Sequence, residues 1–197
     1  MKAVLLYRYF YKSRYYYAAV LFIYIAALSC GISCAGALAD KAQIYSYTAW
    51  SLVLKTAVPL VAIGFGGLFF AGSVLIVSAV CYSAYTCGFI IGTQFAVSFW
   101  SGIAYVFFSA LPLGIVYMCL TAFASVTALQ CNAARYKIRR KGLQRPMTNY
   151  EIRQYIGKMM ITFGADIVMI LLEYYVFAAA YVNLLALYLA HKLQPEK

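Results

Sequence analysis

Two acidic residues near the end of the chain, Asp166 and Glu173, are the side chains best suited to chemistry, because both lie within an apolar stretch. Seven positions separate them, so a helix would hold them on one face, within about 20° of each other. An ionised carboxylate in lipid is costly unless it is paired or faces water, which makes such acids functional candidates. We expect Asp166 to lie shallower, with Lys158 as a candidate neighbour. For Glu173, structural hydrogen bonding and a proton or cation role both stay open.

The other reactive side chains form no recognisable catalytic or metal site. The single histidine, His191, is remote from the cysteines, and no two cysteines make a CxxC pair, so no zinc site is expected. The HExxH, GxSxG, GxGxxG and P-loop patterns are absent. We therefore predict no catalysis, no cofactor and no metal. The six cysteines are expected to be small apolar residues rather than a disulfide framework: Cys30, Cys34, Cys81, Cys87, Cys119 and Cys131.

A long uncharged run points to the lipid bilayer as the environment of the chain. No charged side chain occurs between Lys55 and Arg135, and 65% of all residues are hydrophobic whereas only 11% are charged. About 20 apolar residues cross a bilayer as a helix, so this run holds several spans. The sequence predicts an all-α, polytopic membrane helix bundle without room for a separate soluble catalytic domain.

The net charge of +11 is explained by membrane topology rather than by nucleic-acid binding. Four of the 16 cations lie in residues 1–14 and eight lie in residues 135–158, each group beside an apolar segment. Basic clusters in that position mark the cytoplasmic side of a membrane and attract anionic lipid headgroups. We therefore expect a multi-pass protein of the cell membrane, with the N-terminus and the loop 135–158 cytoplasmic and the C-terminus outside.

This topology predicts five spans. The first span takes the chain out of the cytoplasm, so the uncharged run must cross the membrane an odd number of times to bring the second basic cluster back. Three crossings fit its length, and the last span follows the basic loop. The single membrane domain, 1–197, divides into a basic interfacial segment 1–14, four spans in 16–134, the basic loop 135–158 and a last span in 159–190. A helix is expected to begin near Asn149, capped by Thr148 and Glu151. The spans are placed near 16–38, 57–80, 82–99, 102–131 and 159–189, with an outward amphipathic segment at 40–55 and a tight break near 81–87.

Small residues and a proline suggest where helices meet. Gly88 and Gly92 form a small-xxx-small pair in GFIIG, which lets another helix approach to backbone contact. Pro112 and Gly114, in ALPLGIVY, predict a kink in the fourth span. Both features are interpreted first as determinants of packing.

With these spans in place, the chain resembles the stage II sporulation protein M family. The resemblance covers about residues 16–190 and rests on four segments in order: IAALSCGISCAGAL in the first span, GFIIGTQFAV, GIAYVFFSALPLGIVYMCLTAFASV, and ILLEYYVFAAAY around Glu173. Leu113 and Gly114 stand where that family often has an amide-bearing residue, and Cys87 stands where it often has a cation.

The resemblance implies a non-enzymatic membrane scaffold that localises the peptidoglycan-degrading stage II sporulation proteins D and P during septal thinning and engulfment. The residues it singles out for packing and docking are Gly88, Gly92, Leu111, Pro112 and Glu173. The rival hypothesis is a permease-like transport subunit or small channel, in which Glu173 and Pro112 line a polar path. A shortage of intramembrane polar residues favours the scaffold. The oligomeric state, including a homo-oligomer, stays open.

Overall fold

The computed structural model of the chain describes residues 2–37, 49–69, 72–97, 99–107, 111–140 and 149–177. The regular structure in these ranges is entirely helical, so the predicted all-α bundle is confirmed. The elements are α1 (Lys2–Ala37), α2 (Ala49–Leu68), α3 (Gly72–Val97), α4 (Phe99–Tyr105), α5 (Leu111–Arg140), α6 (Asn149–Leu172) and a π-helical turn at Glu173–Phe177 that continues α6.

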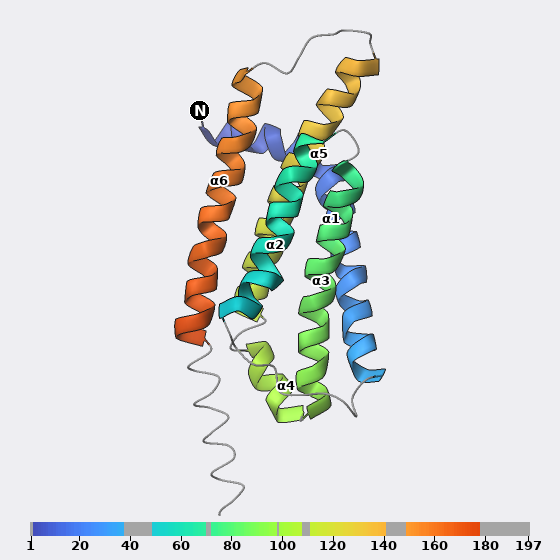
Figure 1. Cartoon of the computed structure of the whole chain (residues 1–197), viewed down its shortest axis with the longest axis vertical. Coiled ribbons are helices and arrows are strands. Elements are labelled where there is room, and N and C mark those ends of the chain that lie inside the picture. Colours follow the sequence, from blue (N-terminus) through green and yellow to red (C-terminus); the bar gives the residue numbers. More distant parts are fainter. Residues whose placement is uncertain are drawn as a thin grey trace, which may run out of the picture.

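The long helices run up and down beside one another (Figure 1). The first turns of α1 lie across one end of the bundle, where α5 ends and α6 begins, and α4 lies at the other end (Figure 1). α1 packs along α3, whereas α2 contacts α3, α5 and α6. α2 is therefore part of the bundle, so residues 49–55 of the predicted outward segment belong to a packed helix, whereas residues 40–48 lie outside the described residues.

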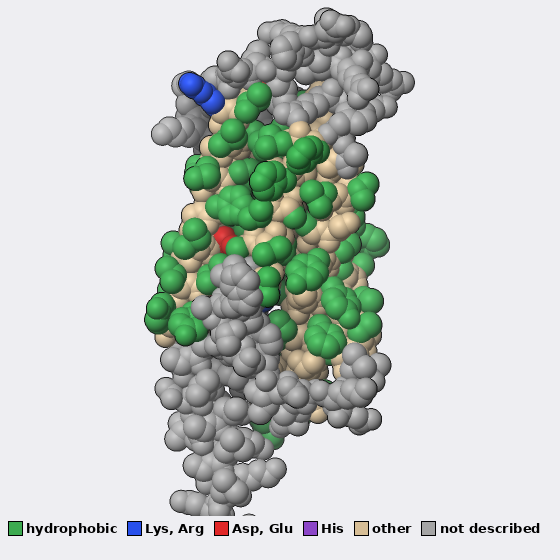
Figure 2. Space-filling model, in the orientation of Figure 1, with side chains coloured by type: hydrophobic (Ala, Val, Ile, Leu, Met, Phe, Trp, Pro, Cys, Tyr) green, Lys and Arg blue, Asp and Glu red, His purple; other side chains and the backbone are tan. Residues whose placement is uncertain are grey.

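Four of the described helices are long and apolar enough to cross a membrane, which supports the predicted multi-pass protein. In the fifth long helix, α2, the described apolar part is Leu54–Leu68, which includes Lys55. Large apolar side chains face outward, as a lipid-exposed surface requires, and Phe22 and Ile161 are each about three-quarters exposed. Figure 2 shows apolar side chains spread over the described flank, with a small acidic patch between them and a basic side chain near the upper end.

The boundary between the second and third spans differs from the prediction. α3 is uninterrupted through Cys81 and Cys87, and the chain turns instead between Phe69 and Gly72. The Gly72 amide donates to the Phe69 carbonyl at 3.2 Å, and a Cβ on Gly66 would lie 2.9 Å from the Gly72 carbonyl oxygen. Glycines therefore allow α2 and α3 to meet at a turn too tight for larger residues.

The expected kink at Pro112 is also corrected. Pro112 is the second residue of α5, in a first turn whose amide groups have no partner within the helix. Proline is well suited to this position, so it starts the helix rather than bending it. The predicted start of a helix near Asn149 is confirmed, and α6 continues from there without a break to Leu172. The expected outward tail lies beyond the described residues.

Candidate functional site

A buried ion pair joins the second helix to the end of the sixth. The Nζ atom of Lys55 lies 3.0 Å from Oε1 of Glu173 and donates a hydrogen bond to it. The side chain of Lys55 is 8% exposed and that of Glu173 is 0% exposed. Charges so deep in a membrane bundle are tolerated when they neutralise each other, as they do here.

Local backbone irregularities accompany both partners. Pro59 lies inside α2, four positions after Lys55, and its missing N–H leaves the Lys55 carbonyl without its usual intrahelical donor. Glu173 is the first residue of the π-helical turn, where the wider winding shifts the register of the side chains that follow. The pair thus lies beside a missing backbone hydrogen bond in α2 and a π-helical turn after α6.

Tyr117 of α5 is the third member of this cluster. The Nζ atom of Lys55 lies 5.5 Å from the centre of the Tyr117 ring, within the range of a cation–π contact. The Tyr117 hydroxyl is buried and has no hydrogen-bond partner in the described structure. Lys55 therefore contacts a carboxylate on one helix and an aromatic face on another.

Asp166 is enclosed inside the bundle. It is 1% exposed, and Thr56 of α2 is its polar neighbour, but neither carboxylate oxygen is in hydrogen-bond geometry with another described group. Lys158, its predicted neighbour, lies eight positions earlier on α6, which is about 12 Å along the helix axis. Asp166 and Glu173 do share the inward face of α6, as their spacing predicted.

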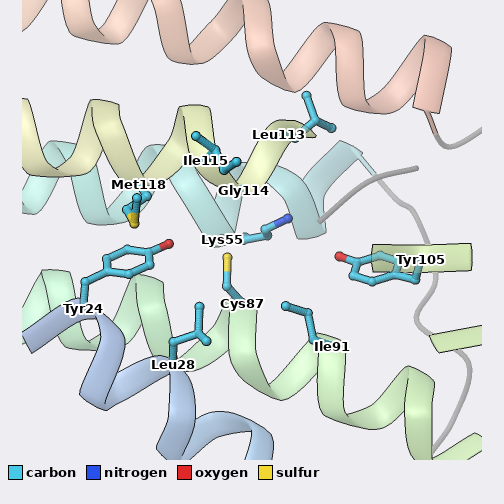
Figure 3. A pocket seen from close by; sticks show the side chains of 10 residues that line it. All are labelled: Tyr24, Leu28, Lys55, Cys87, Ile91, Tyr105, Leu113, Gly114, Ile115 and Met118. Carbon is cyan, nitrogen blue, oxygen red and sulfur yellow. The ribbon is translucent and has the colours of Figure 1, made fainter. Parts of the chain in front are cut away.

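A cavity of about 200 Å³ adjoins the ion pair. Lys55 enters it, and the hydroxyl groups of Tyr24 and Tyr105 and the sulfur of Cys87 point toward its middle (Figure 3). The remaining lining is apolar and comes from Leu28, Ile91, Leu113, Gly114, Ile115 and Met118. Glu173 does not line this cavity, because its carboxylate is enclosed between helices.

The glycines singled out in the sequence lie between α1 and α3 rather than near the charges. A Cβ on Gly88 would lie 3.1 Å from Cα of Leu28, and one on Gly92 would lie 2.6 Å from Cβ of Ala35. Gly31 of α1 makes the reciprocal approach, 2.8 Å from the Phe89 amide nitrogen. Three glycines thus bring the two backbones together within this chain.

The other candidates are scattered. Pro112 and Gly114 lie at the start of α5, where Gly114 lines the cavity and has no atom within 4 Å of an added Cβ. Leu111 is the first residue of α5, and its side chain lies outside the described part. Of the seven predicted site residues, the structure brings together Asp166 and Glu173 in one cluster, and Gly88 and Gly92 in another.

A second set of polar contacts holds the far end of α2. Nδ2 of Asn132 on α5 donates to the Phe69 carbonyl at 3.0 Å, and the Tyr155 hydroxyl on α6 donates to the Gly64 carbonyl at 2.7 Å. These bonds reach backbone carbonyls at or near the helix end, where some lack an intrahelical donor. α2 is therefore fastened to its neighbours by polar groups at both ends.

Lys55 was missed as a site residue, because it was interpreted as the boundary of the uncharged run. Its signal was available: the sequence SLVLKTAVPLV embeds one cation in apolar residues, as ILLEYYV embeds one acid. Two single charges of opposite sign in separate apolar helices predict an ion pair.

Within the cluster, the cation of Lys55 neutralises the charge of Glu173. No group of three or more His, Cys, Asp or Glu side chains suited to a metal occurs among the described residues. Comparison of the chain with family models, curated proteins and solved structures gives no match.

Proposed function

We propose that this chain is a non-enzymatic scaffold of the bacterial cell membrane, of the stage II sporulation protein M type. It would localise membrane-anchored peptidoglycan-degrading proteins, of the stage II sporulation D and P type, during septal thinning and engulfment. The order of the four family-like segments supports this specific role. The closed environment of Glu173 supports the broader class of scaffold.

The ion pair is the observation that carries the choice of a scaffold. A transport path needs polar groups that reach water, whereas Glu173 is fully enclosed and engaged by Lys55. A scaffold needs a bundle that keeps one shape while its outer surface contacts other proteins. A charge pair that fixes α2 to α6 serves that purpose.

The orientation follows from the charges at one end of the bundle. The basic start of α1 lies at the end of the bundle where α5 finishes and α6 begins (Figure 1). We propose that this end faces the cytoplasm, because lysine and arginine accumulate on that side. The far end, with α4, would then face the cell wall, where wall-degrading domains act.

A transport subunit is the second candidate, and two specific features favour it. Asp166 is a buried acid without a described hydrogen bond, and Lys55 enters a cavity of about 200 Å³. Together they resemble part of a polar path. The cavity lining is otherwise mostly apolar, which makes this candidate the weaker one.

Co-purification from the native host tests the proposal. A tagged full-length chain is extracted during sporulation in mild detergent, and its partners are identified by mass spectrometry. We expect membrane-anchored wall-degrading proteins to be enriched over a tagged, unrelated polytopic protein expressed at the same level. Recovery of a nucleotide-binding subunit, or of no partner, would contradict the scaffold.

A charge-neutral variant separates the two candidates further. The double substitution Lys55→Met with Glu173→Gln removes both charges while nearly preserving side-chain shape. A scaffold carrying it should still recruit its partners and support engulfment. If function requires a charged path instead, the folded variant should be inactive.

A further inference from the structure

The charges inside the bundle do not balance when all of them are ionised. Asp166, Glu173 and Lys55 are each buried, which places two potential anions beside one cation. Lys55 is committed to Glu173 at 3.0 Å. An ionised Asp166 would leave one net negative charge in the low-dielectric interior, at a cost of several kcal/mol.

The groups that face Asp166 from the packed helices provide no second cation. α2 contributes Lys55, which is paired with Glu173, and the neutral hydroxyl of Thr56. α5 contributes Tyr117, and the turn after α6 contributes Glu173, whose Oε2 is itself buried without a hydrogen-bond partner. Among the described residues, only a bound proton makes the cluster neutral.

We propose that Asp166 is a proton-binding site and that the folded protein carries a proton on this carboxyl group at neutral pH. The site combines enclosure, two carboxylate oxygens without a described hydrogen bond, and a neighbouring hydroxyl from Thr56. Glu173 is the ionised acid, because Lys55 compensates its charge. The inference is independent of the proposed scaffold role, since it concerns the charge state of the bundle alone.

The bound proton links folding to pH. The folded protein holds a proton on Asp166 that a solvated aspartate would release at neutral pH, so the folded state binds more protons than the unfolded state. Stability should therefore fall as pH rises from the range in which a solvated aspartate ionises up to the value at which folded Asp166 loses its proton, and it should level off above that value. Below that value the neutral cluster is maintained.

Infrared spectroscopy of the full chain tests the protonation state directly. The chain has only five acids, and two of them are aspartates, Asp40 and Asp166. Isotopically labelled aspartate shifts the carbonyl band of a protonated aspartate and leaves glutamate bands unchanged. The measurement uses a detergent without ester groups, because the carbonyl band of an ester would overlap the carboxylic-acid band. We expect one labelled carboxylic-acid band at neutral pH, retained in Asp40→Asn and lost in Asp166→Asn.

Matched amide variants test the same assignment through stability. Asn resembles a protonated Asp but takes up no proton on folding, so Asp166→Asn should be at least as stable as the parent at neutral pH and should lack the parent's fall in stability with rising pH. Glu173→Gln is the same acid-to-amide change on the same helical face. It leaves the Lys55 cation without its carboxylate partner, so the unfolding midpoint of this variant should fall at neutral pH. The opposite changes in stability on replacing Asp166 and Glu173 distinguish a protonated carboxyl group from an ionised one.

Two results would overturn the proposal. One is a spectrum in which the aspartate signal at neutral pH is carboxylate only. The other is a labelled acid band that persists in Asp166→Asn, since it would then belong to Asp40. The spectroscopic result on the parent protein stands even if one variant fails to fold.

Discussion

Lys55 and Glu173 form a 3.0 Å ion pair although 118 positions separate them in the chain. The contact joins the start of α2 to the end of α6, two segments that the order of helices alone would not bring together. Lys55 is the buried cation among the described residues, and Glu173 is the acid that it contacts, so each compensates the charge of the other. The pair therefore selects one arrangement of α2 and α6, in the way that buried polar groups fix register in other bundles.

Breaking this pair should be far more damaging than removing it. Lys55→Met leaves Glu173 buried and uncompensated, which should lower the free energy of unfolding by about 3–5 kcal/mol. Glu173→Gln strands the cation in the same way. The double variant removes both charges and should recover most of the loss. Denaturation of the four proteins in one detergent, analysed as a double-mutant cycle, measures the coupling.

Additive losses in that cycle would show that the two charges act independently. Cys119→Ser is a control for effects of substitution and purification that do not involve the ion pair. Cys119 is exposed, so this substitution should leave stability nearly unchanged. A double variant as unstable as either single one would contradict the argument from charge balance.

The close approach of α1 and α3 predicts a second contrast. A methyl group on Gly88 would press into the backbone at Leu28, and helix backbones cannot yield locally, so Gly88→Ala should cost about 1–3 kcal/mol. Gly114 lies in a helix with open space around it, and Gly114→Ala should be neutral or stabilising by about 0.5–1 kcal/mol. Thermal unfolding of both variants tests this, and equal effects would rule out the glycine contact as a packing determinant.

The fold class was predictable because the bilayer imposes it. An uncharged run of that length cannot be buried in a small soluble domain, and only helices fit the composition. The helix boundaries were less predictable, since the turn at Phe69–Gly72 depends on an approach of Gly66 to Gly72 that no periodicity records. Pro112 was misplaced for the same reason, because a proline starts a helix or bends one depending on where the chain turns.

The candidate site was predictable in part. The spacing of Asp166 and Glu173 on one helical face followed from helix geometry alone. Their depth and partners did not, because they depend on where α2 begins. Because α2 starts at Ala49 and not after Lys55, the lysine lies within the bundle and not at a membrane boundary. A search for compensating charges across the whole chain would have found this pair.

The hydroxyl of Tyr155 gives a third, smaller prediction. It donates to the Gly64 carbonyl at 2.7 Å, so Tyr155→Phe should cost about 1 kcal/mol while the ring still packs. Tyr175 is 68% exposed on the same helical segment, and Tyr175→Phe should change stability by less than about 0.5 kcal/mol. Both substitutions remove one hydroxyl, so their difference in unfolding midpoint isolates the buried hydrogen bond.

The topology of the bundle predicts which connections face which side of the membrane. The start of α1, the end of α5 and the start of α6 lie at one end, and the end of α1 and the start of α2 lie at the other (Figure 1). A reporter inserted within 141–148 should therefore be active in the cytoplasm, and one within 38–48 should be active outside. The prediction depends on α2 crossing the membrane with Lys55 neutralised, because an unpaired lysine would favour leaving α2 at the surface. The Lys55→Met variant with the same reporters separates the path of the helices through the membrane from the effect of the lysine charge. It removes the cation within α2, so the reporter within 141–148 should remain cytoplasmic, and an external signal there would contradict a bundle of five passes.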